Sequence, residues 1–301
     1  METREKQIYR ITLVGSVVNA VLVALKFVAG VVGHSSAMIA DAVHSLSDFA
    51  TDVVVIGFVR VASKPEDSDH AHGHGKYETL ASVIVGVMLV AVGVGLGVEG
   101  VMKTIGFFKG EELETPNWWA LGAALVSVVA KEWLYRYTVH GGARLNSPAL
   151  VSNAWHHRSD AYTSLATLAG IAGSMLLGPR WRVLDPLAAT LVSGFIVWSG
   201  WEMIKPGLDE LLEKSLSRSE QTELGNIIES TPGVKAYHHL RTRRIGPHRA
   251  LSVHAKMDPN LTLKQAHEIA SDVEQRIRKR FGDDTYITGH MERYMAETRE
   301  Y

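Results

Sequence analysis

The stretch that decides the fold is residues 37–61, AMIADAVHSLSDFATDVVVIGFVRV, which is apolar along most of its length. It is long enough to cross a bilayer, whose core of roughly 30 Å takes about 20 residues of helix. Its acidic and histidine residues stand three, four and four positions apart, which in a helix puts them on one stripe. They are Asp41, His44, Asp48 and Asp52. Charged groups at membrane depth normally face a partner or a water-filled cavity, so the stripe predicts a functional site inside a membrane domain.

Five other stretches before residue 205 approach the same length and apolarity. The full set is Ile11–Val32, Ala37–Val61, Leu80–Met102, Trp118–Val139, Ala149–Leu177 and Val183–Ile204. The charged start of the chain and the full spanning length of its first apolar run do not have the form of a cleavable signal peptide. Six crossings put both termini on one side, and the modest excess of Lys and Arg in the loops of that side favours the cytoplasm. We therefore expect a polytopic α-helical membrane domain with six transmembrane helices over residues 1–208.

Overall composition excludes several classes of protein. The 31 Lys and Arg residues nearly balance the 32 Asp and Glu residues of the 301-residue chain, so it lacks the basic excess of a nucleic-acid binder. Cysteine is absent, which excludes a disulfide framework, a thiolate nucleophile and a Cys-based zinc finger. The 14 histidines are the anomaly of the composition.

After about residue 209 the composition becomes that of a soluble domain. We expect two helices and three strands at Ser217–Thr231, Val234–Arg244, Ala250–Met257, Leu263–Phe281 and Thr285–Met291. Ser217 and Glu220 could form a capping box at the start of the first helix. The order is αββαβ, which predicts a small cytoplasmic α+β domain over residues 209–301.

The fifth apolar stretch also pairs a histidine with an aspartate four positions on. Residues 153–164 read NAWHHRSDAYTS and contain His156 and Asp160, which match His44 and Asp48 in the second stretch. Two such helices face to face would supply two imidazoles and two carboxylates, a tetrahedral set of the kind that Zn²⁺ accepts. Two carboxylates also neutralise a divalent ion, so the filled site would carry no net charge in its low-dielectric setting.

His157 is an alternative ligand, because it stands three positions before Asp160; we prefer His156 on spacing and take His157 as its neighbour. Each pair could instead be a hydrogen-bonded contact that holds two helices together. The other polar residues of the apolar stretches are interpreted as pathway or packing groups (Asp41 and Asp52) and as structural or interfacial groups (Lys26, Lys131 and Glu132).

Such a site can exchange metal for protons. Metal ligands must be deprotonated to bind, so metal and protons compete for the same atoms. Imidazole is the natural proton acceptor near neutral pH. If the site opens alternately to the two sides of the membrane, this competition becomes metal/proton exchange without ATP.

Several motifs, in one order, resemble the cation diffusion facilitator family and specifically its bacterial zinc/proton antiporters. They are HSSAMIADAVHSLSD (34–48), HGHGKYETLAS (72–82), WHHRSDAYTS (155–164) and PGVKAYHHLRTRRIGPHRALSVHAKM (232–257). The resemblance covers nearly the whole chain. It implies a homodimer in the bacterial cytoplasmic (inner) membrane, inward- and outward-facing states, and a cytoplasmic domain with a metallochaperone-like fold. The transport site that it implies, between the second and fifth spans, consists of His44, Asp48, His156 and Asp160.

The resemblance also implies a metal site in the loop PEDSDHAHGHGK (65–76), with ligands Asp67, His70 and His74 and with His72 as an extra imidazole. The alternative is a solvated histidine-rich loop that binds metal weakly.

In the cytoplasmic domain the resemblance implies a two-metal site at the dimer interface, with ligands His238, His254, His267, His290 and Glu292. The sequence departs from the family pattern at His239, where an Asp might be expected, and at Glu292, where an Asp follows the last histidine. Lys76 resembles a lysine that holds the dimer together by pairing with an acid, here Glu213, with Asp209 also in reach.

The leading hypothesis is a secondary transporter that exports Zn²⁺ against proton influx, with Zn²⁺ also as a structural or regulatory ion. The ligand set suits Co²⁺, Ni²⁺ and Cd²⁺ as well, and the same mechanism could carry Fe²⁺ or Mn²⁺. In the family, all-carboxylate or Asn-containing sites are associated with manganese. A membrane-anchored metal sensor without flux is the alternative of another class. An intramembrane metalloenzyme is disfavoured, because the sequence lacks an H-E-x-x-H motif and four protein ligands leave no open position.

Overall fold

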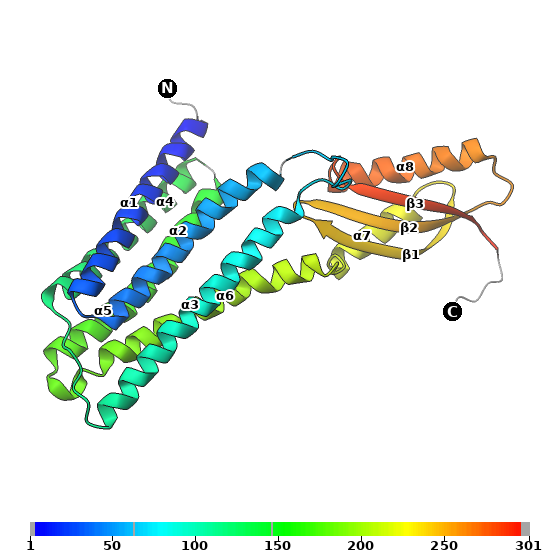
Figure 1. Ribbon diagram of the computed structural model, residues 1–301. Coiled ribbons are helices and arrows are strands. Elements are labelled where there is room, and N and C mark those ends of the chain that lie inside the picture. Colours follow the sequence, from blue (N-terminus) through cyan, green and yellow to red (C-terminus); the bar gives the residue numbers. More distant parts are fainter. Residues whose placement is uncertain (1–3, 63, 146, 296–301) are drawn as a thin grey trace. The chain divides into compact units, whose positions relative to one another are not determined.

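The computed structural model describes residues 4–62, 64–145 and 147–295 (Figure 1). Six long helices come first, with one 3-10 turn before the last of them: α1 (Arg4–Val32), α2 (Ser36–Ala62), α3 (Lys76–Phe108), α4 (Trp118–Arg144), α5 (Pro148–Leu176), η1 (Pro179–Trp181) and α6 (Leu184–Leu211). The elements that follow are α7 (Arg218–Glu229), β1 (Val234–Ile245), β2 (His248–Met257), α8 (Leu263–Phe281) and β3 (Tyr286–Arg293). The predicted αββαβ order of the C-terminal part is confirmed.

Three helical segments of the described chain are long and apolar enough to cross a membrane: Lys6–Val32, Lys76–Phe108 and Pro179–Leu211. The helices α4 and α5 fall outside this set, since both carry several charged and histidine residues along their length. The six crossings therefore stay a prediction. Polar residues lower the mean hydropathy of the helices that fall outside the set.

The chain divides into two compact units, each of which contains two separate stretches of the sequence. The first holds the chain up to Val54 together with Ile84–Ile204. The second holds Val55–Val83 together with the chain from Lys205 onward. The histidine-rich loop and the ends of α2 and α3 that flank it thus belong with the C-terminal domain.

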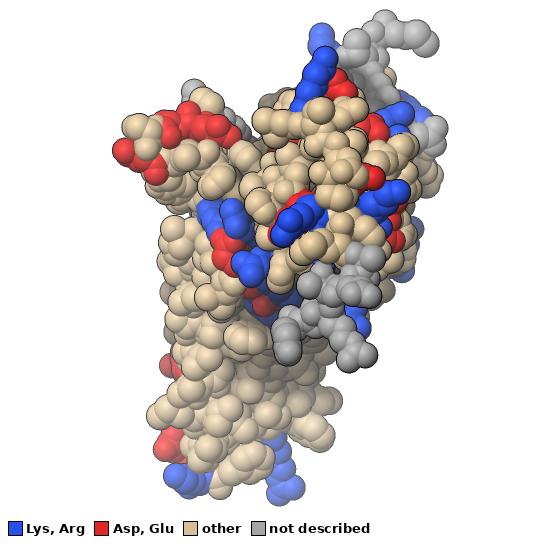
Figure 2. Space-filling view, turned by 90° about the vertical axis from the view of Figure 1, so that its right-hand side faces the viewer, with Lys and Arg blue, Asp and Glu red and all other residues tan. Residues whose placement is uncertain are grey.

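The first unit is apolar outside and polar inside. Many of its large apolar side chains are exposed, among them Val28 on α1, Met88 on α3 and Trp198 on α6. Figure 2 shows a wide area with few charged side chains over the long helices. The interior, by contrast, buries lysine, aspartate, histidine, serine and threonine side chains. This is the arrangement expected of helices that meet lipid outside and enclose a polar site.

Small residues let the helices of this unit approach closely. Its core is rich in buried alanine, from α1, α2, α4 and α6. One close approach is between α3 and α6: a Cβ atom added to Gly86 would lie 2.8 Å from the carbonyl oxygen of Gly200. Small residues at helix interfaces are typical of membrane bundles, where packing rather than the hydrophobic effect drives association.

The second unit contains a three-stranded sheet in the order β1-β2-β3. The strands β1 and β2 are antiparallel, and β2 and β3 are parallel. Buried residues of β2 (Leu251 and Val253) form one core with Leu224 of α7 and with Val273 and Ile277 of α8. Because side chains alternate along a strand, the residues between those of β2 face away from this core.

Two helix starts in this unit are fixed by their sequence. Ser217 and Glu220 form the predicted capping box of α7, and Thr262 and Gln265 form another at α8. Each box pairs a side chain with the backbone N–H of the other residue and so satisfies donors at the helix start that lack intrahelical partners.

We predict that Gly86→Val destabilises the protein, because the added side chain would meet the α6 backbone. Overpacking of this kind typically costs about 1–3 kcal/mol. The melting temperature of the purified protein in detergent is the measurement. Gly95→Val is the matched control on the same helix, since no atom of another element in the described part of the chain lies within 4 Å of a Cβ added there. Equal melting of the two variants would contradict the close α3–α6 contact.

Candidate metal centres

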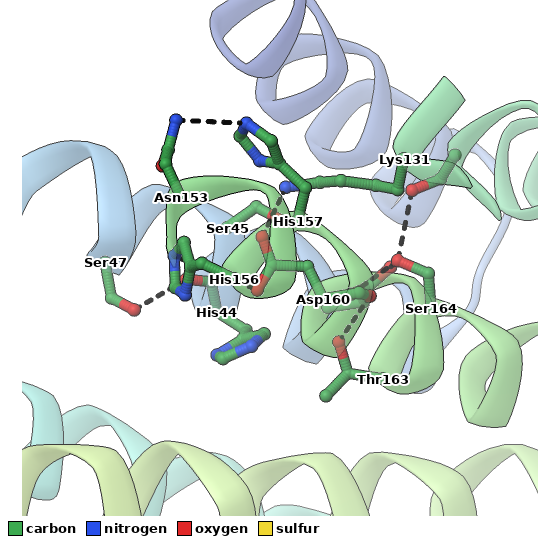
Figure 3. Close-up of polar contacts among 12 residues, drawn as sticks. His44, Ser45, Ser47, Lys131, Asn153, His156, His157, Asp160, Thr163 and Ser164 are labelled. Atoms are coloured by element: carbon green, nitrogen blue, oxygen red, sulfur yellow. Dashed lines mark hydrogen bonds and ion pairs between the residues drawn. The ribbon is translucent and has the colours of Figure 1, made fainter. Parts of the chain in front are cut away.

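The first centre lies inside the helical unit, where α2 and α5 present His44, His156 and Asp160 to one cavity of about 980 Å³. His156 Nε2 is 4.0 Å from Asp160 Oδ1. Asp160 is 3% exposed and His44 is 7% exposed, whereas the imidazole of His156 is about half exposed. Figure 3 shows the three side chains gathered in one region. The structure thus brings together three of the four expected ligands; the side chain of Asp48 lies outside the described residues.

Two ring atoms in this cavity have no hydrogen-bond partner among the described residues although they are buried: His44 Nδ1 and His157 Nδ1. The other nitrogen of His157, Nε2, is 3.5 Å from the Asn153 amide nitrogen. A buried nitrogen without a partner is costly, and a metal ion is one group that satisfies it. His157 is buried and directed to Asn153, whereas His156 is the histidine for which an ion pair with Asp160 is found.

Two lysines were not anticipated as members of this site. Lys131 of α4 donates from Nζ to Asp160 Oδ2 at 2.6 Å, and both side chains are buried. Lys26 of α1 pairs in the same way with Asp41 at 2.8 Å, with both side chains 0% exposed. The signal in the sequence was a lysine in the middle of an apolar stretch, which requires an acidic partner nearby.

Serine hydroxyls extend the ion pair of Lys26 and Asp41 into a wider network. Lys26 Nζ donates to Ser45 Oγ at 2.9 Å and to Ser164 Oγ at 3.0 Å. Ser164 Oγ in turn donates to the Asp41 carboxylate at 3.1 Å. Helices α1, α2 and α5 are therefore linked one turn away from the histidines, because Ser164 stands four positions after Asp160.

The second centre is in the loop before α3. Its expected ligands Asp67, His70 and His74 all offer ligand atoms within 4.8 Å of one another. Asp67 lies 3.3 Å from the imidazole of each histidine, measured from Oδ1 to His70 Nδ1 and from Oδ2 to His74 Nε2. The backbone N–H of His70 donates to Asp67 at 2.7 Å and lowers the pKa of that carboxyl, so that it stays ionised. The loop is therefore folded on itself around a carboxylate and two imidazoles.

The third centre is a row of histidines across the sheet. The register pairs His238 on β1 with His254 on β2, and His254 with His290 on β3. Glu292, two positions after His290, shares their face by the alternation of the strand. Its two oxygens each lie 2.8 Å from a histidine nitrogen, His238 Nε2 and His254 Nδ1. These hydrogen bonds, that of His254 first, lower the pKa of Glu292.

Two further histidines relate differently to this row. His239 sits at an irregularity of the β1–β2 pairing with a φ of 49°, and its ring lies 4.5 Å from that of His238 and 5.2 Å from that of His254. It therefore joins the cluster, although the sequence had marked it only as a departure from the family pattern. His267 is exposed on α8 and is not among the residues that the structure groups with Glu292.

The ion pair between Lys76 and Glu213 is present in the second unit. Glu213 also accepts from Arg243 of β1 at 3.0 Å, and Asp209 pairs instead with Lys214. All these side chains are about a third exposed or more, so each pair contributes at most about 1 kcal/mol. The bridge fixes where the start of α3 meets the segment after α6 rather than supplying stability.

Comparison with known proteins gives two family matches. Residues 12–212 match a cation efflux transmembrane domain, and residues 216–294 match the cytoplasmic domain of cation efflux proteins. A manganese efflux system protein, MneP of Bacillus subtilis, is 35% identical over 99% of this chain and 100% of its own length. Metal tolerance protein 2 of Oryza sativa is 33% identical over 90% of this chain and 74% of its own length.

Other relatives belong to magnetosomes. The magnetosome protein MamB of Paramagnetospirillum magneticum is 31% identical over 84% of this chain and 83% of its own length. Among solved structures, a nickel form of the C-terminal domain of MamM is 25% identical, with a TM-score of 0.25, over 26% of this chain and all of that domain.

We predict that replacing His238 and His254 together by Ala removes zinc binding at the sheet, because both groups that hold the Glu292 oxygens are lost. Isothermal titration of the full-length protein measures the number of bound ions. The control is His267→Ala, at the exposed position on α8. Full binding in that control means that one chain completes the site, and reduced binding means that a second copy supplies His267. Unchanged stoichiometry in the double variant would contradict a metal site here.

Proposed function

Because the chain belongs to the cation efflux family, we propose that it exports a divalent transition-metal ion from the cytoplasm in exchange for protons. The transport site would consist of His44 and Asp48 on α2 with His156 and Asp160 on α5. The observation that carries the proposal is the burial of His44 and Asp160 beside His156 around one cavity of a bundle that is apolar outside.

The chemistry of these groups supports exchange. A divalent ion that enters must displace protons from the imidazoles, because only neutral imidazole and ionised carboxylate bind metal. Protons that enter from the opposite side refill the nitrogens and release the ion. Since protons and metal use the same atoms, a proton gradient can drive metal uphill without ATP. The four-ligand set has no place for a water nucleophile, which agrees with a transporter rather than a metalloenzyme.

We propose Zn²⁺ as the transported ion, because two imidazoles in a tetrahedral set suit zinc better than manganese or magnesium. Manganese is the second candidate, since a relative that matches the whole chain is a manganese efflux protein. Cobalt, nickel, cadmium and iron would share the site chemistry. Ligand type ranks these ions, and flux measurements decide among them.

The cytoplasmic domain would act as a metal-sensing dimerisation module. The histidine row lies on the face of the sheet away from its helical core, where a second copy could cover it. Bound metal would then join two protomers and bias the transport cycle. The loop centre would be a secondary site, and Lys76 with Glu213 would set the hinge. In this proposal the protein is a homodimer of the bacterial inner membrane, with both termini and the C-terminal domain cytoplasmic.

We predict that Asp160→Asn abolishes metal-driven proton movement, because one carboxylate of the site loses its charge. The experiment uses vesicles that contain the full-length protein, a pH gradient and a panel of Zn²⁺, Mn²⁺, Fe²⁺, Co²⁺, Ni²⁺ and Cd²⁺. We expect the wild type to transport zinc fastest and the variant to lose at least about 90% of the flux, since removal of a ligand or its supporting group reduces metal affinity about 10–100-fold or more.

Glu99→Gln serves as the matched control, because Glu99 is an exposed acid of the same unit that pairs with Lys103. It should transport like the wild type. Flux that survives in Asp160→Asn would contradict the assigned site. Metal binding without flux in the wild type would instead support the sensor hypothesis. Faster flux of manganese than of zinc would make manganese, not zinc, the substrate.

A further inference from the structure

The Asp160 carboxylate is shared between two functions, one for each oxygen. Oδ2 accepts from Lys131 at 2.6 Å, while Oδ1 is the oxygen directed to His156. The ammonium of Lys131 therefore occupies Oδ2, and Oδ1 remains directed to the cavity. Because both side chains are almost fully buried, the ammonium acts on Asp160 without screening by bulk water.

Charge counting shows what this ammonium does to a bound ion. Two carboxylates and one divalent ion make a neutral site, and a protonated lysine raises the total to one positive charge. Lys26 does not add to this excess, because its own acid, Asp41, is not among the expected ligands. Lys131 differs from Lys26, because the acid that it pairs with, Asp160, is itself an expected ligand. A cation fixed at that position repels a metal ion on the neighbouring oxygen.

From this geometry we propose that Lys131 is a tethered cation that weakens metal binding at the transport site and so speeds release of the ion. The inference rests on the proposed role of Asp160 as a ligand. A carrier must bind its ion firmly enough to load it and loosely enough to let it go, as in conduction through multi-site channels. Most differences in affinity among variants of one site arise from the dissociation rate, so a site that binds the ion more weakly also releases it faster.

Lys131 also keeps the empty site neutral around Asp160. A buried carboxylate without a cation is strongly disfavoured, and the ammonium supplies one from within the chain. The same lysine thereby holds the side chain of Asp160 in place for the next ion. A purely structural lysine that clamps α4 to α5 would have a different consequence, because its loss would weaken metal binding together with stability.

The test compares Lys131→Gln with wild type in vesicles and in detergent, using Zn²⁺ as the probe. We expect Lys131→Gln to lower the KM for zinc about tenfold or more and to lower the maximal rate, because removal of a nearby positive charge tightens binding. The equilibrium dissociation constant for zinc should fall by about the same factor as the KM. Lys131→Arg keeps the charge and should stay near the wild-type values, and Lys131→Met provides a second uncharged variant if Gln does not fold.

Lys26→Gln is the matched control, since it leaves a different buried aspartate without its ammonium. It should lower the melting temperature without lowering the KM for zinc. An unchanged or higher KM in folded Lys131→Gln and Lys131→Met would overturn the inference and leave Lys131 a structural clamp. Asp160→Asn distinguishes failure of the proposed transport site from failure of the role of Lys131. If Asp160→Asn keeps both zinc binding and flux, the proposed transport site is wrong. If Asp160→Asn loses flux while Lys131→Gln behaves like the wild type, only the role of Lys131 is wrong.

Discussion

The interior of the helical unit depends on one electrostatic constraint: an ionised carboxylate away from water must have a cation against it. The structure meets this constraint twice, with Lys26 at Asp41 and with Lys131 at Asp160. These pairs explain why a bundle whose outside is apolar can keep acids in its centre. In the proposed transport site, a metal ion would arrive as a second cation at the Asp160 carboxylate, which already pairs with Lys131.

The constraint separates the membrane centre from the two centres in the second unit. Glu292 and Asp67 are partly exposed, and neutral or titratable donors hold them: histidine nitrogens in one case and backbone N–H groups in the other. The proposed transport site differs from both, because the buried ammonium of Lys131 already pairs with Asp160 there.

The sequence predicted those features that depend on spacing along one segment. The helical period placed His156 and Asp160 on one face. Four residues were enough to predict the capping box of Ser217 and Glu220. The αββαβ order was predicted from the alternation of apolar residues and the turn residues between segments. Features that depend on contact with a second helix or strand could not be predicted from the sequence. The pairing of Lys131 with Asp160 joins two helices, and spacing on either of them says nothing about the other.

The same limit applies to the sheet. Histidines on β1, β2 and β3 form one row only because β2 and β3 pair in parallel at a particular register, which a strand sequence does not specify on its own. The part of His239 in the cluster depends on a local irregularity of β1 and a positive φ, which few residues other than glycine adopt. His267 shows the converse, since a histidine of the expected type on the expected helix does not reach the row within one chain.

The second unit also ties its two centres together mechanically. The hairpin turn of β1 and β2 lies against the start of α3: a Cβ atom added to Gly246 would lie 2.6 Å from the carbonyl oxygen of Gly75, the residue after the loop ligand His74. Glu210 near the end of α6 accepts from the Gly246 N–H at 2.7 Å and from Thr79 Oγ1 at 2.8 Å. A metal ion bound in the loop and one bound on the strands of the hairpin would therefore both lie on segments that meet at this contact. The helices α2, α3 and α6 each have residues in both units, so continuous helical segments connect this contact to the unit that holds the proposed transport site.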